Sequence, residues 1–224
     1  MDATSFAKRY PVLYHMADEA AWPTIRRHGL LSTAAIVDLY RPEPSIAAAI
    51  LSKVRTESIT LHSNALGAVT VRDQLPLRRL QECLHPGVTA RQYLDALNGR
   101  VYFWVSAARL QKLLNATAYR NRQQLVLHVS TAALLAEYGD SVELAPYNTG
   151  NTRWPNSPKR GPDIFVPFAD YPFDEWQRKL RRKKEDVVVE FTVPYAVPDI
   201  SKYVTHVELR HRDNPPVPLE LADD

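Results

Sequence analysis

The chain has 224 residues, a formal net charge of +3, 45% hydrophobic residues and 24% charged residues, which are values of an ordinary globular protein. No apolar run is long enough to cross a bilayer, and the first residues lack the charged-then-apolar order of a secretion signal, so we expect a cytoplasmic protein without a membrane partner. The single cysteine, Cys83, excludes an internal disulfide framework and a thiolate metal cage.

The first half of the chain alternates strand-like runs with helical segments. Runs rich in β-branched or aromatic residues predict strands over residues 11–17 and 67–74. Helix start and stop signals predict short helices, which cover residues 23–29, 34–40, 45–57 and 89–99. Thr89 and Gln92 have the spacing of a capping box at the start of the last of these helices.

Strands dominate the second half of the chain. The strand-like runs there cover residues 100–106, 125–130, 141–147, 186–194 and 203–212. Helices are predicted between them, over residues 106–116, 131–138 and 173–184. Because strands and helices alternate early and strands gather late, we predict an α+β fold with a single domain over residues 1–212. Residues 213–224 are expected to form a flexible tail.

Several widespread site motifs are absent from the sequence. There is no G-x-G-x-x-G, no phosphate-binding P-loop, no H-E-x-x-H and no G-x-S-x-G. The seven histidines are scattered, and no two of them are spaced to share one face of a helix or strand. We therefore expect no metal site, no Rossmann dinucleotide site and no hydrolase nucleophile elbow.

A long loop over residues 148–172 is rich in proline, asparagine and aromatic residues. Long ordered loops of this kind are often functional. Trp154 can stack on a base, and Lys159 and Arg160 can contact phosphate, which makes these residues candidates for nucleic-acid binding. The alternative is a rigid, proline-pinned loop that packs on the core.

A basic run, R-K-L-R-R-K-K, follows over residues 178–184. Arg181, Arg182 and Lys183 are the candidates in this run for contacts with nucleic-acid phosphates. The alternative is a solvated end of a helix, where cations suit the helix dipole.

Two residues carry unusual placements in apolar strands. His15 ends a strand-like run, and Glu190 interrupts a run of valines and a phenylalanine. A buried carboxylate is expensive unless it is paired, so Glu190 either faces solvent, pairs with a cation or lies at the floor of a cleft where positive charge develops. His15 alone is typical of a core histidine that is hydrogen-bonded to the backbone.

Taken together, separate segments of the sequence resemble a known enzyme family. They are L-Y-H-M followed by W-P-T-I-R-R-H-G-L-L-S, a central V-Y-F, and a late V-E-F-T-V-P-Y-A-V-P-D-I. This order resembles the NAD-dependent ADP-ribosyltransferases of the compact His–Tyr–Glu type, and it is most similar to the DarT toxins, which modify DNA bases. The segments N-G-R-V-Y-F-W and V-P-F-A-D-Y-P indicate a separate bacterial family of this fold. The resemblance implies a mixed or antiparallel split sheet flanked by helices.

The resemblance also implies roles for individual residues. Glu190 stands at the position of the catalytic glutamate, and Arg72 is our candidate for the active-site arginine. His15 stands where the family holds a ribose hydroxyl of NAD. The full set of residues expected to bind NAD is Tyr14, His15, Arg100, Tyr102 and Phe103, with Tyr102 near nicotinamide and Arg100 near the pyrophosphate. NAD is then a substrate, and no metal is required.

The function implied is mono-ADP-ribosylation of DNA or RNA by a toxin or phage-defence effector, with a cognate antitoxin as a further partner. Three alternatives stay open on the sequence. The same enzyme class can act on a protein or small-molecule acceptor. A non-catalytic nucleic-acid or partner-binding module can keep the fold, and it predicts that His15 and Glu190 are far apart or that each is satisfied by its own partner. An unrelated α+β protein is the third alternative.

Overall fold

Most strands of the described residues build one long sheet in which the paired strands are antiparallel. A computed structural model describes residues 2–212 and 214–220. In this part of the chain, the sheet has the order β12-β11-β6-β1-β5-β9-β7-β8. Its strands are β1 (Val12–Asp18), β5 (Arg100–Trp104), β6 (Gln124–Ser130), β7 (Glu143–Ala145), β8 (Val166–Pro167), β9 (Glu190–Pro194), β11 (Val204–Arg210) and β12 (Val217–Leu219).

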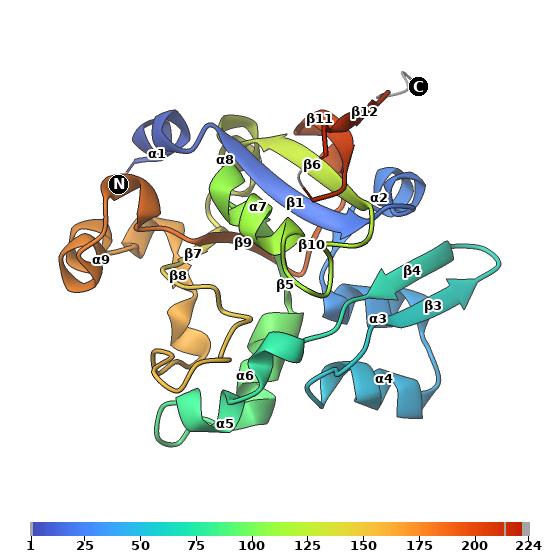
Figure 1. Ribbon diagram of the computed structural model, residues 1–224, viewed down its shortest axis with the longest axis horizontal. Helices are drawn as coiled ribbons and strands as arrows, with labels where there is room; N and C mark the ends of the chain where they lie inside the picture. Colours follow the sequence, from blue (N-terminus) through green and yellow to red (C-terminus); the bar gives the residue numbers. More distant parts are fainter. Residues whose placement is uncertain (1, 213, 221–224) are drawn as a thin grey trace.

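The sheet has two halves that meet at one residue pair. β1 pairs with β6 along its whole length, but it pairs with β5 only where Tyr14 lies opposite Trp104. In Figure 1, β1 crosses the upper part of the molecule while β5 runs down toward α6. The sheet is therefore open between β1 and β5 beyond this pair, and the predicted α+β class is confirmed.

The two faces of the sheet carry different apolar clusters. The main core lies on the face of β1 that carries Leu13, where Phe103 and Phe191 also pack. On the other face, Met16 and Val126 are covered by leucines of α7. Side chains alternate between the faces of a strand, so neighbouring residues of β1 and β5 contribute to different clusters.

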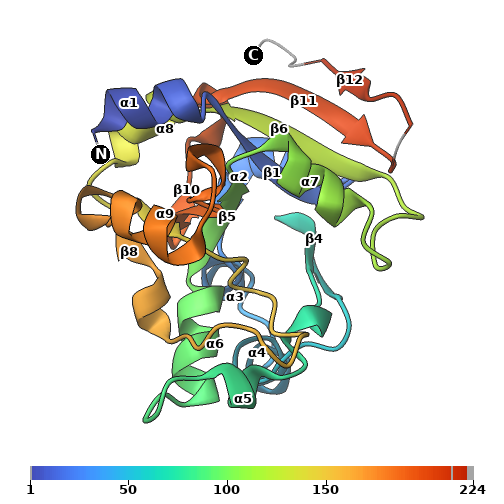
Figure 2. The ribbon, with the colours of Figure 1, turned by 60° about the vertical axis from the view of Figure 1, so that its left-hand side comes forward.

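Helices pack against the sheet and below it. They are α1 (Ala3–Arg9), α2 (Trp22–His28), α3 (Thr33–Tyr40), α4 (Pro44–Leu51), α5 (Leu80–Cys83), α6 (Ala90–Asn98), α7 (Ala107–Leu114), α8 (Thr131–Tyr138) and α9 (Phe173–Leu180). Short 3-10 turns cover Leu75–Leu77, Pro162–Ile164, Phe168–Asp170, Lys184–Asp186 and Ile200–Lys202. α1 and α8 pack together at one end of the sheet, and α7 lies against β1 and β5 (Figure 2).

The segment from α3 to α6 lies below the sheet in both views (Figures 1 and 2). It contains a hairpin of β3 (Ile59–Ser63) and β4 (Gly67–Val71), which packs with α3 and α4 around a small apolar cluster. A further pair, β2 (Leu30–Leu31) with β10 (Ala196–Val197), ties this segment to the connection between β9 and β11.

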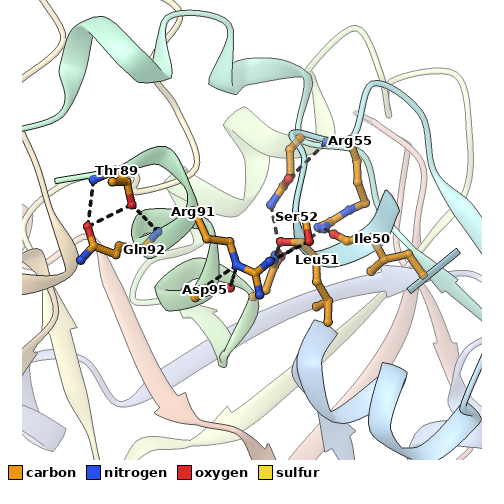
Figure 3. Close-up of polar contacts among 10 residues, drawn as sticks. Ile50, Leu51, Ser52, Arg55, Thr89, Arg91, Gln92 and Asp95 are labelled. Atoms are coloured by element: carbon orange, nitrogen blue, oxygen red, sulfur yellow. Dashed lines mark hydrogen bonds and ion pairs between the residues drawn. The ribbon is translucent and has the colours of Figure 1, made fainter. Parts of the chain in front are cut away.

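Several local predictions are confirmed. Thr89 and Gln92 form the capping box of α6, with the Gln92 N–H donating to Thr89 Oγ1 at 3.2 Å and the Thr89 N–H donating to Gln92 Oε1 at 2.9 Å (Figure 3). Ser32 caps α3 through its hydroxyl. Gly29 ends α2 with φ 80°, and a Cβ there would lie 2.4 Å from the Cα of Pro198. Only glycine fits this turn.

Two predicted helices end earlier than expected. α4 stops at Leu51 because side chains satisfy its last carbonyls: Arg55 donates to the Ile50 carbonyl at 2.5 Å and Asn98 to the Leu51 carbonyl at 3.2 Å (Figure 3). α9 stops at Leu180 because Arg181 adopts the left-handed conformation with φ 50°. Both ends depend on contacts or backbone angles that the local pattern does not show.

The end of the chain also differs from the prediction. Val217–Leu219 form β12 against β11, so this part of the expected tail is an edge strand. Residues 213 and 221–224 lie outside the described residues. The strand predicted over 186–194 begins only at Glu190, although the preceding valines are buried. β3 was not predicted at all.

Candidate active site

A cavity of about 440 Å³ opens between the two halves of the sheet. β1 and β5 line it from above, β4 and α3 from below, and residues 148–150 close one side. Its volume lies within the usual range of about 300–1,000 Å³ for small-molecule and cofactor sites. His15 and Glu190, which are far apart in the sequence, both line this cavity.

His15 lies at the point where β1 and β5 separate. Its Nδ1 is 2.8 Å from the carbonyl oxygen of Tyr102, so Nδ1 carries the proton and donates it to that carbonyl. Burial, with a smaller contribution from the nearby Arg72, lowers the pKa of His15 to about 4, although the hydrogen bond to the Tyr102 carbonyl opposes this shift. The ring is therefore neutral at pH 7, with Nε2 as an acceptor. Because Nδ1 is occupied, the imidazole can only accept a hydrogen bond from a ligand hydroxyl, through Nε2.

Glu190 is the first residue of β9 and is only 4% exposed. Its carboxylate accepts hydrogen bonds from Thr149, at 3.2 Å from the backbone N–H and at 2.7 Å from the hydroxyl. Burial raises the pKa of Glu190 to about 7, although the Thr149 bonds and the charges of Arg160 and Arg109 favour the ionised form. A carboxyl poised near neutrality at a cavity wall is typical of a functional group.

Arg72 lies in the same cavity, as expected for an active-site arginine. Its Nη2 donates to Gln124 Oε1 at 2.6 Å, and its guanidinium lies over the Tyr119 ring at 4.8 Å. The backbone is fixed as well, because Arg55 Nε donates to the Arg72 carbonyl at 2.8 Å. Arg55, itself 7% exposed, is a structural residue that the sequence did not identify.

Aromatic side chains form a row beside Glu190. Tyr14 lies opposite Trp104 on β1 and β5, and Trp104 lies opposite Glu190 on β5 and β9, so all three point to one face. Tyr102 lies on this face two residues away and donates its hydroxyl to the Leu97 carbonyl at 3.1 Å. Tyr14 and Tyr102 line the cavity as predicted, and Trp104 is an additional wall residue.

Two predicted NAD contacts are used by the fold. Phe103 points to the opposite face, is 1% exposed and packs on Phe191 with ring centroids 6.0 Å apart, so its ring is part of the core. Arg100 forms a two-pronged ion pair with Glu143 at 2.6 and 2.9 Å and covers the Phe165 ring at 4.1 Å. Phe103 lies on the other side of the strand from Tyr102, yet it also lines the cavity, with its ring 5.8 Å from that of His15, so its contact with NAD stays a prediction.

The loop candidates separate into buried and exposed residues. Arg160 was predicted to contact nucleic acid, but it is 2% exposed and donates to the carbonyls of Asn148, Thr149 and Asn151. This prediction was wrong because the backbone of the loop occupies the guanidinium. Trp154 is 65% exposed, in agreement with a surface role.

The remaining cations of the predicted patch differ in the same way. Arg182 is half-buried and donates to the carbonyls of Pro146 and Asp186 at 2.7 and 3.3 Å, which ties down the start of the loop. Arg181 and Lys183 are exposed. Lys159 is exposed too, but its ammonium donates to the Glu82 carbonyl at 2.6 Å.

Sequence reasoning missed Thr149, which is the direct partner of Glu190. A signal existed: the loop that contains it was singled out as long, ordered and poor in periodicity. Nothing in the local pattern shows which residue of N-T-G-N reaches a strand 41 residues further along the chain.

The comparison with known protein families completes this description. Residues 11–204 match a family described as a family of unknown function, DUF7002. The chain belongs to the DUF7002 family. A curated relative, a chromosome partition protein Smc of Mycolicibacterium paratuberculosis (strain ATCC BAA-968 / K-10), is 27% identical over 148 residues, which cover 63% of this chain and 12% of that protein. The chain thus spans only a small part of that relative.

The residues that match the DUF7002 family, 11–204, include His15, Arg72, Thr149 and Glu190. A second polar cluster is centred on Glu208, outside the matched range, where His128 and His206 meet across β6 and β11. The expectation that no two histidines share a face of one helix or strand did not address this pair, which lies on two neighbouring strands.

No group of three potential metal ligands is placed to hold an ion in residues 2–212 and 214–220. Within the same residues, no helix has both the length and the apolar character that a membrane span needs.

Proposed function

We propose that this member of the DUF7002 family is an NAD-dependent mono-ADP-ribosyltransferase, with DNA or RNA as its acceptor. The observation that carries the proposal is the shared cavity of His15 and Glu190. These residues come from different halves of the sheet and reach one cleft at the point where the halves separate. A non-catalytic module with the two residues far apart would not show this shared cleft, although each side chain also has its own partner, the Tyr102 carbonyl for His15 and Thr149 for Glu190.

The chemistry assigned to Glu190 is stabilisation of positive charge. When the bond between nicotinamide and the ribose C1′ breaks, nicotinamide leaves with the bonding electrons and the sugar becomes oxocarbenium-like. An ionised carboxylate stabilises this transition state more than the substrate, which lowers the barrier. The acceptor then forms a bond to C1′ and loses its proton, which Glu190 can take because burial brings its pKa to about 7.

The role assigned to His15 is to hold a ribose hydroxyl. Its Nδ1 proton is committed to the Tyr102 carbonyl, so Nε2 can accept a hydrogen bond from that hydroxyl. The neutral state also keeps a second positive charge away from the cationic nicotinamide ring. Arg72 supplies a positive charge in the cavity wall, suited to the NAD phosphates.

The acceptor assignment rests on the loop that carries Thr149. One end of this loop holds Glu190 through Thr149, and further along it Trp154 exposes 65% of its surface. An exposed indole near such a site can stack on an unpaired base. A protein or small-molecule acceptor is the alternative that the experiment must separate.

The test is transfer of label from NAD. Purified protein is mixed with NAD labelled in the adenosine half, with single-stranded DNA, RNA, lysate protein or no acceptor, and with Glu190→Gln as the matched variant. We expect label on one nucleic acid and none with Glu190→Gln. Label on protein would move the acceptor to the alternative class. A folded wild type that neither binds nor consumes NAD would contradict the enzyme assignment.

A further inference from the structure

Arg160 is a buried cation that makes no direct contact with a carboxylate in the described part of the chain. It is 2% exposed and forms no ion pair within the described residues. Its Nη1 lies 3.2, 3.3 and 3.1 Å from the carbonyl oxygens of Asn148, Thr149 and Asn151, and its Nε lies 3.0 Å from that of Pro158. Burying a charge without a charged partner costs free energy, which points to a role of Arg160 besides closing the loop.

The backbone of Arg160 is anchored independently of its side chain. Its N–H donates to the Cys83 carbonyl at 2.8 Å, and its carbonyl accepts from the His85 N–H at 3.0 Å. The guanidinium therefore extends from a fixed point into the loop. Because the Arg160 backbone is anchored to Cys83 and His85, the guanidinium can fix the position of the carbonyls that it contacts.

One peptide unit links Arg160 to Glu190. In the Asn148–Thr149 peptide, the carbonyl oxygen accepts from Arg160 and the N–H donates to both oxygens of the Glu190 carboxylate. A trans peptide is planar, and its C=O and N–H point in opposite directions. Fixing the oxygen therefore fixes the direction of the N–H. The positively charged guanidinium beside the carbonyl oxygen also polarises the peptide, which strengthens the hydrogen bond that the Thr149 N–H donates to Glu190.

The next carbonyl is held by two donors. The Thr149 carbonyl accepts from the buried Tyr93 hydroxyl at 3.0 Å and from Arg160 at 3.3 Å. Both contacts orient Thr149 so that its hydroxyl reaches Glu190 at 2.7 Å. The charged or titratable groups that act on Glu190 are Arg160, Arg109, Tyr93 and Tyr102, together with His15 in the shared cavity.

We propose that Arg160 is a positioning residue for Glu190, acting through the Asn148–Thr149 peptide that it holds in place. The inference deepens the proposed function and rests on it for its catalytic meaning. The effect on Glu190 does not require NAD. Without the guanidinium, the N–H and hydroxyl of Thr149 lose their alignment, and the ionised form of the Glu190 carboxyl is less stabilised.

The variants separate this role from general support of the loop. Arg160→Met removes the guanidinium, and Arg160→Lys keeps the charge without the planar fork. Tyr93→Phe removes one of the two donors to the Thr149 carbonyl. Arg182→Met is the matched control, because Arg182 holds the Pro146 carbonyl just before this loop but not the Asn148–Thr149 peptide.

The measurement is the titration of the Glu190 carboxyl carbon by ¹³C NMR, with the signal identified by its loss in Glu190→Gln. We expect the midpoint to rise by about one pH unit in Arg160→Met, and by less in Arg160→Lys and Tyr93→Phe. Arg182→Met should leave it unchanged. If Arg160→Met does not fold, the other two variants decide the question.

An unchanged midpoint in the Arg160 and Tyr93 variants, or an equal rise in Arg182→Met, would overturn the positioning role. The acid limb of NAD consumption should move with the NMR midpoint. A wild type without turnover, in which the Arg160 variants still shift the Glu190 titration, would reject the transferase and leave the coupling intact.

Discussion

Glu190 and Glu208 are both 4% exposed and lie on strands of the same sheet, yet the fold treats them differently. Glu208 is surrounded by cations and donors: His128 lies 3.1 Å and Arg210 lies 3.2 Å from its carboxylate. Burial alone would raise the pKa of Glu208, but these contacts hold it below its usual value. Glu190 has no ion pair in the described residues, and burial raises its pKa to about 7.

Glu208 is therefore a carboxylate that stabilises the folded state, whereas the ionised form of Glu190 destabilises it. The Glu208 charge is neutralised within its own cluster, and Glu208 does not line the cavity. The Glu190 charge is kept at the cavity wall with only hydrogen bonds from Thr149. A site that is to stabilise developing positive charge must leave its carboxylate uncompensated until the ligand arrives. The two residues therefore serve as matched controls for each other.

The largest expected effect is on NAD turnover. Glu190→Gln removes the negative charge and should lower the rate of NAD consumption by about 100-fold or more. Glu208→Gln should leave the rate within about threefold, because Glu208 does not line the cavity. The check is initial-rate nicotinamide release at pH 8. Equal losses in the two variants would mean that the difference between the carboxylates has no catalytic meaning.

The second effect is on stability, and the two substitutions should act in opposite directions. For Glu190, the folded pKa lies above the unfolded value, so stability is lost as pH rises from about 4.5 to about 7. Glu190→Gln should therefore raise the free energy of unfolding at pH 8, by up to about 3 kcal/mol. For Glu208, the folded pKa is lowered, so its contribution is present above pH 4.5 and is lost in acid.

Glu208→Gln should accordingly lower the free energy of unfolding at pH 8 by about 1–2 kcal/mol, because Arg210 and His128 lose a charged partner. Urea unfolding of the wild type and both variants at pH 5 and pH 8 measures the two signs. Destabilisation of similar size in both variants at pH 8 would show that Glu190 is compensated after all.

The third effect is on NAD affinity, and a histidine near each carboxylate allows the same comparison. His15 shares the cavity with Glu190, whereas His128 contacts Glu208. In a Glu190→Gln background, His15→Ala should weaken NAD binding about tenfold, the value of roughly one hydrogen bond. His128→Ala should leave NAD binding unchanged. Titration calorimetry at pH 7.5 and pH 6 provides the measurement. The affinity of Glu190→Gln for NAD should be the same at both pH values, since the pKa of His15 is about 4 and its ring stays neutral.

The sequence already contained part of this distinction. On a strand, the residues two positions away share a face, and those of Glu208 are His206 and Arg210, so the pattern itself offers partners. The corresponding neighbours of Glu190 are Val188 and Thr192, which offer no charge. The local pattern could therefore point to Glu190 as the unusual carboxylate. It could not supply Thr149, because that contact is made by a distant loop.

The burial of side chains in the loops was harder to predict, because it too depends on contacts with distant segments. Strand periodicity and cap residues gave the elements, including the capping box at Thr89 and the turn at Gly29. Arg160 and Trp154 belong to one loop of similar composition, yet one is 2% and the other 65% exposed. Their burial depends on where the loop backbone turns back on Cys83, which no local spacing encodes.

The smallest expected effect concerns the basic run, where the structure separates cations used by the fold from exposed ones. Arg181 and Lys183 are exposed, whereas Arg182 is tied to loop carbonyls. If the acceptor of the Glu190 site is a nucleic acid, the double variant Arg181→Gln/Lys183→Gln should weaken binding of single-stranded DNA a few-fold at low salt. Loss of two phosphate contacts should also reduce the slope of log K against log salt by about 1.4. Fluorescence anisotropy between 50 and 200 mM salt measures both quantities, with Lys202→Gln as an exposed control on the 3-10 turn before β11. An equal loss in the control would reduce the basic run to general surface charge, and the acceptor site would then have to be sought at Trp154 alone.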